Sequence, residues 1–141
     1  MSRQTSEPID WNARFEGCFP GLVGLRLRKA EPDEVIGVLD VRKALFAPNG
    51  YLHAGAVVTL ADTCCGVGAL RTLPDGATGF TTIDLSSNFL STAREGKAIC
   101  SATPLHLGRR TQVWDAAVTS TATGRPMAQF RCTQMVLWPK G

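Results

Sequence analysis

The run HAGAVVTLADTCCGVGALRTL, residues 53–73, decides the fold. Drawn as a helix, it places apolar side chains on nearly every face, and Asp62 is its only charged residue before Arg71. A helix that is apolar all round has to be buried inside the molecule. Gly66 and Gly68 lower the helix propensity, so we expect either close packing or an irregularity at these two glycines.

Strands are predicted on both sides of this helix. Six strand-like runs occur, at residues 21–30, 34–42, 81–90, 97–107, 112–121 and 126–138. The turn signals between neighbouring runs predict hairpins and therefore a mainly antiparallel sheet. Only this sheet is large enough to cover the apolar helix. We expect one α+β domain over residues 1–141, with a curved sheet wrapped around one long central helix and a short helical turn at residues 10–15.

Composition narrows the classes of function. The 141 residues are 44% hydrophobic, with a net charge of +3 and scattered basic residues, which argues against a nucleic-acid-binding protein. No apolar run free of polar groups reaches the roughly 18 residues of a membrane span, and residues 1–12 do not resemble a signal peptide, so a cytoplasmic protein is expected. The five cysteines form no C-x-x-C pair and there are only two histidines, so no metal site is predicted.

The long helix itself contains the residues best suited to chemistry. Its start, near Ala54, offers free backbone N–H groups that can polarise a carbonyl. Asp62 is a carboxylate in apolar surroundings, which should raise its pKa and suit it to act as a base or a nucleophile. The alternative is a structural aspartate that caps or pairs with a neighbour. Asp62 lies eight residues beyond Ala54, about 12 Å along one helix, so a site that uses both residues needs a second, antiparallel copy of the helix.

Several short motifs of the chain resemble a known family. Leu52-His53-Ala54-Gly55, the nine-residue step from His53 to Asp62 and the following Thr63 are similar to the H-G-G-x6-[DE] signature of hotdog-fold thioesterases. The resemblance is to the phenylacetic-acid-degradation and 4-hydroxybenzoyl-CoA thioesterase types. Asn88-Phe89-Leu90 and the segment 105–109 also match the family's pattern, and together these motifs cover roughly residues 35–137.

The resemblance implies a hotdog-fold acyl-CoA thioesterase. Asp62 would be the nucleophile or general base, and the backbone N–H of Ala54, with Gly55 beside it, would polarise the thioester carbonyl. His53 would shape the turn rather than transfer protons. The further substrate contacts expected are Asn49, Gly50, Thr63, Asn88, Arg109 and Arg110, of which the two arginines would meet the CoA phosphates or remain solvated surface charges. CoA is part of the substrate, so no separate cofactor is expected. A homodimer is the expected minimal unit, and because hotdog thioesterases are often tetramers, a homotetramer is expected as well.

The chain departs from the family's pattern at two places, which keeps alternatives open. Ala47 stands where the family often has Asn or Gln, and Ser91 stands where a basic residue is frequent, with Arg94 as a nearby substitute. One alternative is therefore an acyl-CoA-binding or regulatory module without hydrolysis. Another is a hotdog hydratase or dehydratase, although a second acid–histidine motif is not evident. A cysteine nucleophile at Cys64 or Cys65 would need a histidine within reach, and no G-x-S-x-G elbow occurs.

Overall fold

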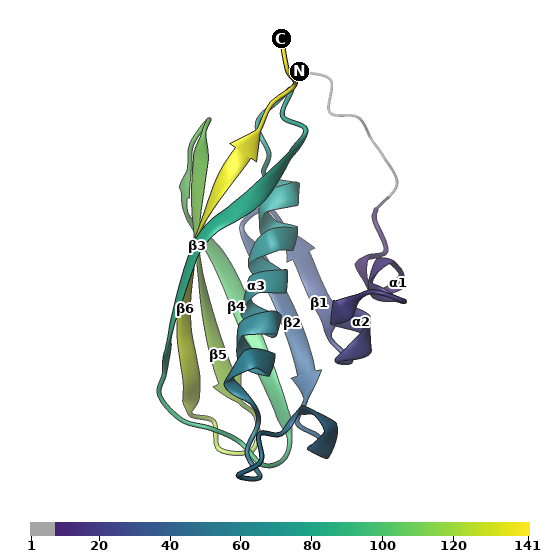
Figure 1. Ribbon diagram of the computed structural model, residues 1–141, viewed down its shortest axis with the longest axis vertical. Helices are drawn as coiled ribbons and strands as arrows, with labels where there is room; N and C mark the ends of the chain where they lie inside the picture. The colour runs from purple at the N-terminus through teal and green to yellow at the C-terminus, as the bar shows by residue number, and fades with distance from the viewer. Residues whose placement is uncertain (1–7) are drawn as a thin grey trace.

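The structure, a computed structural model, describes residues 8–141 and consists of one sheet and one long helix, with two short helices before the first strand (Figure 1). Residues 1–7, which belong to the segment expected to hold no signal peptide, lie outside the described residues. The elements are α1 (Trp11–Phe15), α2 (Phe19–Leu22), β1 (Arg26–Glu31), β2 (Glu34–Asp40), η1 (Lys43–Leu45), α3 (Ala54–Arg71), β3 (Gly79–Phe89), β4 (Lys97–Leu107), β5 (Thr111–Ser120) and β6 (Pro126–Leu137).

The six strands form one sheet in the order β1-β2-β4-β5-β6-β3, and every neighbouring pair is antiparallel. Helix α3 lies along one face of the sheet and contacts all six strands (Figure 1). The predicted α+β architecture is confirmed. The strand order adds one point that the turn pattern did not predict, because β3 pairs with β6 instead of its chain neighbour β4 and so becomes an edge strand.

Close packing explains the glycines of the central helix. A Cβ atom on Gly68 would lie 2.5 Å from the ring of Trp114, and one on Gly66 would lie 3.3 Å from the ring of Phe80. Helix α3 is nevertheless continuous through both positions. Of the two outcomes expected at these glycines, close packing is therefore the one observed, because the missing Cβ atoms make room for aromatic rings from the sheet.

Helix α3 is the core element of the fold. By length and composition alone, its 18 residues would be long and apolar enough to cross a membrane. Its buried side, however, already packs on the sheet: Leu60, Ala61, Cys64, Cys65 and Ala69 have no exposed surface. The four buried cysteines, Cys64, Cys65, Cys100 and Cys132, are free thiols, as expected for small core residues.

One predicted boundary is wrong. The strand expected at residues 21–30 begins only at Arg26, because residues 21 and 22 belong to helix α2 and residues 23–25 to the turn that follows it. Pro20 stands in the first turn of α2, where its fixed φ favours a helix and its missing N–H costs nothing. Gly24, with a φ of +82°, then redirects the chain. The apolar alternation in this region arises because Val23, at the end of the helix, and Leu25, in the loop that follows, are both buried.

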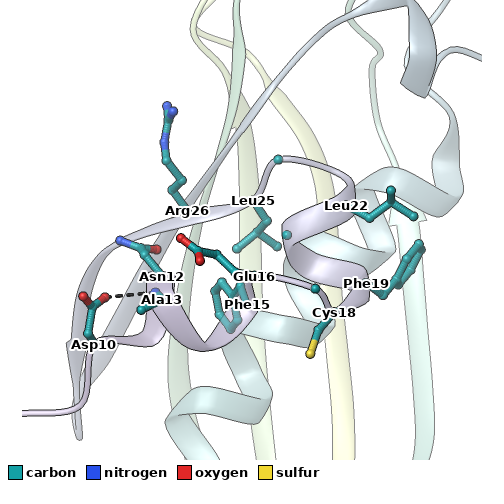
Figure 2. A pocket seen from close by; sticks show the side chains of 13 residues that line it. Asp10, Asn12, Ala13, Phe15, Glu16, Cys18, Phe19, Leu22, Leu25 and Arg26 are labelled. Atoms are coloured by element: carbon teal, nitrogen blue, oxygen red, sulfur yellow. Dashed lines mark hydrogen bonds between the residues drawn. The ribbon is translucent and has the colours of Figure 1, made fainter.

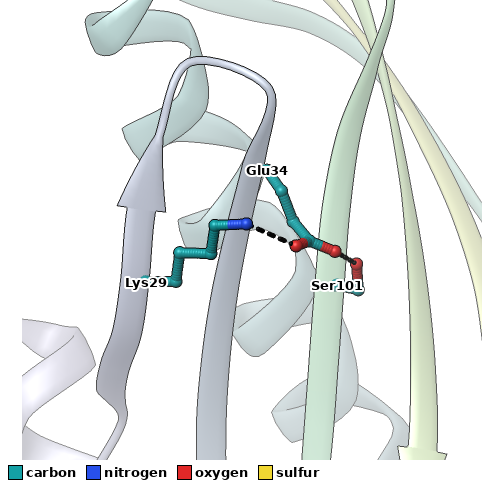
Figure 3. Close-up of polar contacts among 3 residues, drawn as sticks. All are labelled: Lys29, Glu34 and Ser101. Atoms are coloured by element: carbon teal, nitrogen blue, oxygen red, sulfur yellow. Dashed lines mark hydrogen bonds and ion pairs between the residues drawn. The ribbon is translucent and has the colours of Figure 1, made fainter.

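The face of the sheet that points away from α3 carries charged side chains that pair across neighbouring strands. Lys29, Glu34 and Ser101 lie on three neighbouring strands, where Glu34 accepts from the lysine ammonium at 2.9 Å and from the serine hydroxyl at 2.7 Å (Figure 3). The Ser101 hydroxyl, followed by Lys29, holds the pKa of Glu34 below its usual value. Asp115 and Arg131 form a bidentate pair farther along the same face. Glu34 and Asp115 are therefore both paired with basic side chains of the same sheet.

Candidate active site

The first turn of α3 is held by its own N-cap. The side chain of His53 accepts a hydrogen bond at Nδ1 from the backbone N–H of Gly55, at 2.7 Å. The backbone N–H of His53 donates to the carbonyl of Leu45 at 2.9 Å, which ties η1 to the start of the helix. Among the hydrogen bonds of residues 8–141, none uses the N–H of Ala54. The N–H groups of Ala54 and Gly55 therefore differ, because only that of Ala54 remains available to a ligand.

Asp62 is a half-buried carboxylate on the central helix. Burial raises its pKa above the ordinary aspartate value. Within residues 8–141, its side chain takes part in neither a hydrogen bond nor an ion pair. A structural aspartate would be expected to cap a helix or to pair with a base, so the alternative of a satisfied buried Asp finds no support in these contacts.

Asp62 belongs to the side of α3 that the sheet leaves uncovered. Val58, Thr59 and Thr63 are half-buried on the same side. We call this set, with Asp62 and the exposed Leu70, the open face of α3. Ala54 and Asp62 are eight residues apart on a continuous helix, which corresponds to about 12 Å. A single carbonyl group cannot touch both residues of one chain.

The loop before α3 is closed by its own hydrogen bonds. The Oδ1 atom of Asn49 accepts from the N–H of Tyr51 at 3.1 Å. The N–H of Gly50 donates to the carbonyl of Ala47 at 3.0 Å, and Gly50 has a φ of +86°, a conformation that favours glycine. Asn49 therefore engages its side-chain carbonyl within the loop, whereas its side-chain NH2 group makes no hydrogen bond among residues 8–141.

The other predicted substrate contacts lie at a distance from the start of α3 in the same chain. Asn88 pairs with Gln129 across β3 and β6, and both lie on the outer face of the sheet near Arg131. Arg109 is in the β4–β5 turn, where its guanidinium stacks 4.1 Å from the ring centroid of Trp138. Arg110 follows it in this turn. The structure thus groups His53, Ala54 and Gly55 in one turn, leaves Asp62 and Thr63 two turns away, and brings none of Asn88, Arg109 and Arg110 to them.

A cysteine nucleophile does not fit this geometry. Cys64 and Cys65 are fully buried, and the neighbouring Cys132 thiol together with burial raises the pKa of Cys65 far above its usual value. A nucleophilic cysteine needs the opposite shift. His53 uses Nδ1 to cap the helix, so it does not pair with either thiol through that atom.

Two cavities lie near the N-terminal half of the chain. The larger, of about 910 Å³, is an open pocket lined by α1, α2 and the start of β1, and no residue of α3 lines it (Figure 2). The smaller, of about 470 Å³, lies beside the first turn of α3 and is lined by His53, Gly55 and Thr59 together with apolar residues of α2 and η1. Sequence reasoning had not connected these apolar residues with the site. Their only signal was the clustering of aromatic and aliphatic residues at positions 19–23 and 44–46.

Comparison with known proteins gives a consistent result. The family model described as the thioesterase superfamily matches residues 49–126. The 1,4-dihydroxy-2-naphthoyl-CoA hydrolase of Escherichia coli is 32% identical over 127 residues, covering 89% of this chain and 91% of that protein. The enzyme of the same name from Listeria monocytogenes is 28% identical over 111 residues, covering 79% and 89%.

Solved structures agree with the sequence comparison. The crystal structure of a mutant thioesterase from Pseudomonas aeruginosa superposes with a TM-score of 0.87 at 27% identity and covers 96% of each chain. A thioesterase from Haemophilus influenzae superposes with a TM-score of 0.84 at 26% identity, covering 90% of this chain and 87% of that one. These matches confirm the predicted hotdog fold.

Proposed function

The chain belongs to the thioesterase superfamily, and from this premise we propose that it hydrolyses an acyl-CoA thioester with Asp62 as its catalytic carboxylate. The protein is a thioester hydrolase, like the relatives named CoA hydrolase and thioesterase. The observation that carries the role of Asp62 is its environment. It is a half-buried carboxylate with a raised pKa and without a partner in residues 8–141, on the open face of the central helix. A group that is costly to bury and unpaired is a candidate for chemistry.

Two chemical routes are available to an ionised Asp62. As a general base it takes a proton from a water molecule, whose oxygen attacks the thioester carbon. As a nucleophile it attacks that carbon itself and forms an anhydride, which water then opens. In both routes the carbon–sulfur bond breaks, and the CoA thiolate leaves and is protonated. One turnover in ¹⁸O-labelled water followed by mass spectrometry identifies the nucleophilic route when the anhydride opens at the aspartyl carbon, because only that opening leaves ¹⁸O in the protein.

The free N–H of Ala54 is the proposed donor to the thioester carbonyl. Support comes from its lack of a partner among the described residues and from its place at the positive end of an 18-residue helix. A donor aimed at the developing oxyanion stabilises the transition state more than the substrate. His53 would hold the conformation of the turn by accepting from the N–H of Gly55, so the N–H of Gly55 would have a structural role.

We infer that a homodimer is the minimal active unit. The separation of about 12 Å between Ala54 and Asp62 requires the donor of one copy and the carboxylate of another. Two features support a two-fold pair: the open face of α3, and the 11-residue edge strand β3. Along this edge Ile83, Leu85 and Phe89 are 53%, 43% and 48% exposed, and long apolar edge strands are rarely left bare. Association of two such dimers into a tetramer stays a prediction.

Cross-linking tests the dimer directly. If Ala54 of one copy meets Asp62 of the other, Val58, which is midway between them, meets its own counterpart near the axis. In a Cys18→Ser background, which removes the one exposed cysteine, Val58→Cys should be joined efficiently by a short bismaleimide. Leu70→Cys, on the same open face but near the end of α3, is the matched control and should stay uncross-linked. Equal cross-linking at both positions would contradict the antiparallel arrangement.

The same arrangement provides a role for the basic turn between β4 and β5. Helix α3 spans about 27 Å from end to end, and this turn lies at the end away from Ala54 (Figure 1). With two antiparallel helices, Arg109 and Arg110 of one copy come to the end where the other copy's Ala54 lies. We propose that they meet the CoA phosphates, for which arginine geometry is well suited. CoA enters as part of the substrate, and no separate cofactor is proposed.

An aromatic acyl group is the proposed substrate class. Support comes from the two relatives named for an aromatic acyl-CoA, 1,4-dihydroxy-2-naphthoyl-CoA, at 32% and 28% identity. A role in phenylacetic-acid degradation and a cytoplasmic location stay predictions.

One observation favours a second candidate function, an acyl-CoA-binding module without turnover. Ala47 has no polar side chain to orient water, and the carbonyl of Asn49 is bonded within the loop. Free-thiol release by the purified protein over aryl, short-chain and long-chain acyl-CoAs, with Asp62→Asn alongside, tests both. Hydrolysis that is lost in the variant supports the enzyme. Binding without release in the wild type would support the module. Full activity in the variant would overturn the role of Asp62.

A further inference from the structure

The smaller cavity has an almost entirely apolar lining. Of its nine lining residues, only His53 and Thr59 have polar side-chain atoms. Both already bond within the helix turn, since His53 accepts from the N–H of Gly55 and the hydroxyl of Thr59 donates to the carbonyl of Gly55 at 2.8 Å. The rest of the lining is hydrocarbon and aromatic surface from Phe19, Val23, Ala44, Leu45, Phe46 and Ala56.

The walls of this cavity are fixed to the start of α3. The η1 wall is held by the bond from the His53 N–H to the Leu45 carbonyl, at 2.9 Å, and by the bridge between Phe46 and Leu52. The α2 wall is held by Arg42, whose guanidinium donates to the carbonyl of Leu22 at 3.2 Å. These contacts join three segments of the chain into one preformed apolar pocket.

The position of the pocket relates it to the proposed chemistry. His53 and Gly55, which line it, are the two neighbours of Ala54 in the chain. A thioester whose carbonyl accepts from the N–H of Ala54 therefore has this pocket beside it. The pocket's volume of about 470 Å³ is in the range of small-molecule sites. A short acyl group such as acetyl would leave most of it unfilled, whereas a bulky apolar group would be removed from water by its walls.

We propose that this cavity is the acyl-group pocket and that Phe19 of α2 is a specificity-determining residue that selects flat, bulky aromatic acyl groups. The inference rests on the proposed function and deepens it. Helix α2 lies outside residues 49–126, which match the family model, so selectivity comes from a part of the chain that the shared motif does not include. Phe19 is 59% exposed in the single chain, so its ring has apolar surface available for contact with an apolar ligand.

The larger cavity provides a matched control. Leu22 is on the same short helix as Phe19 and is 74% exposed, but it lines only the larger cavity, whereas Phe19 lines both (Figure 2). The larger cavity includes the charged side chains of Asp10, Glu16 and Arg26, which suit an apolar acyl group poorly. Both exposed side chains can be truncated with little effect on the core.

The test compares Phe19→Ala, Leu22→Ala and Ala44→Trp with the wild type. The measurement is the ratio of kcat/KM for 2-naphthoyl-CoA to kcat/KM for acetyl-CoA. Loss of the wall in Phe19→Ala and filling of the pocket in Ala44→Trp should each lower this ratio about tenfold, the scale of discrimination in apolar pockets, while Leu22→Ala should keep the wild-type ratio. An unchanged ratio in both pocket variants, or an equal fall in Leu22→Ala, would overturn the inference.

A binding measurement separates failure of the pocket from failure of the proposed function. The probe is the non-hydrolysable thioether S-(2-naphthylmethyl)-CoA, titrated calorimetrically into the wild type, Phe19→Ala and Leu22→Ala. If no thioester is hydrolysed but Phe19→Ala alone weakens binding of the probe about tenfold, the pocket stands and the hydrolytic assignment fails. If hydrolysis is observed and depends on Asp62 while Phe19→Ala binds the probe like the wild type, the pocket is refuted and the function stands. If the wild type neither hydrolyses nor binds, both are overturned.

Discussion

Replacing Ala54 with proline would remove a single backbone N–H from the first turn of α3 and leave the helix in place. Proline is favoured at the first helical position, because its φ suits the helix and the lost N–H has no intrahelical partner. The preceding residue must be extended, and His53 already has a ψ of 136°. No hydrogen bond of residues 8–141 depends on this N–H. The variant is therefore a clean removal of the proposed carbonyl donor.

The expected loss of activity is large for the removal of a single N–H group. Removing one donor from an oxyanion site typically lowers kcat by about 10²–10³, and we expect Ala54→Pro to fall in this range. Because one helix cannot bring Ala54 and Asp62 together across about 12 Å, the defect should be complemented by another chain. A heterodimer of Ala54→Pro with Asp62→Asn has one site with both defects and one intact site. Random mixing makes half the dimers heterodimers, so the mixture should recover about 25% of wild-type activity.

The assay is free-thiol release by the two variants alone, by their co-refolded mixture, and by a doubly tagged heterodimer purified from it. Ala54→Ser, which keeps the N–H, is the control for the side-chain change and should retain far more activity than Ala54→Pro. A heterodimer no more active than its parents would refute the shared site. Wild-type turnover in folded Ala54→Pro would refute the polarising role of the N–H.

Three further results follow from burial and packing. Because burial raises the pKa of Asp62, kcat/KM should rise with pH through a limb that lies above the ordinary aspartate value of about 3.9, and Asp62→Asn should lack this limb in a pH–rate profile. The raised pKa also means that ionised Asp62 destabilises the folded state above that pKa. Asp62→Asn should therefore unfold at a higher urea concentration than the wild type at pH 8. The urea midpoints of the two proteins should become equal below about pH 3.9, where the carboxyl group is protonated in both states. Gly68→Ala should lower the free energy of unfolding by about 1–3 kcal/mol, because its Cβ would lie 2.5 Å from the buried Trp114 ring. Gly66→Ala, with its nearest contact at 3.3 Å, should leave stability unchanged or raise it by up to about 1 kcal/mol through helix propensity. Equal urea midpoints for the two alanine variants would contradict this reasoning.

Local patterns predicted most of the architecture because they depend on short-range physics. The all-round apolar run that becomes α3, the alternating strands and the antiparallel hairpins were each predicted within a few residues of their observed bounds. The error at residues 21–30 has a local cause as well. The alternation of Val23 and Leu25 is the same for a strand and for a helix end followed by a loop, and Pro20 was the signal that separates the two.

The candidate site could be predicted only where it lies within one turn or one helix. Ala54 and Asp62 follow from the helix pattern and its rise per residue, and the roles of His53 and Gly55 from the resemblance to the family. The difference between the two N–H groups follows from neither. Capping of Gly55 by the His53 side chain, which leaves Ala54 free, depends on a side-chain rotamer. Asn88 was predicted from a strand motif, but the face of the sheet to which it belongs depends on the pairing of β3 with β6.

Residue order alone predicted the buried helix, its single carboxylate and a site shared with a second copy, because period, charge and the rise per residue are properties of one segment. Tertiary structure decided the rest. It placed β3 at the sheet edge, it left one face of α3 open, and it brought α2 and η1 beside the first turn of that helix to form an apolar pocket. These are relations between segments 30 or more residues apart, such as Phe19 and Gly55, and they arise from how the whole chain packs.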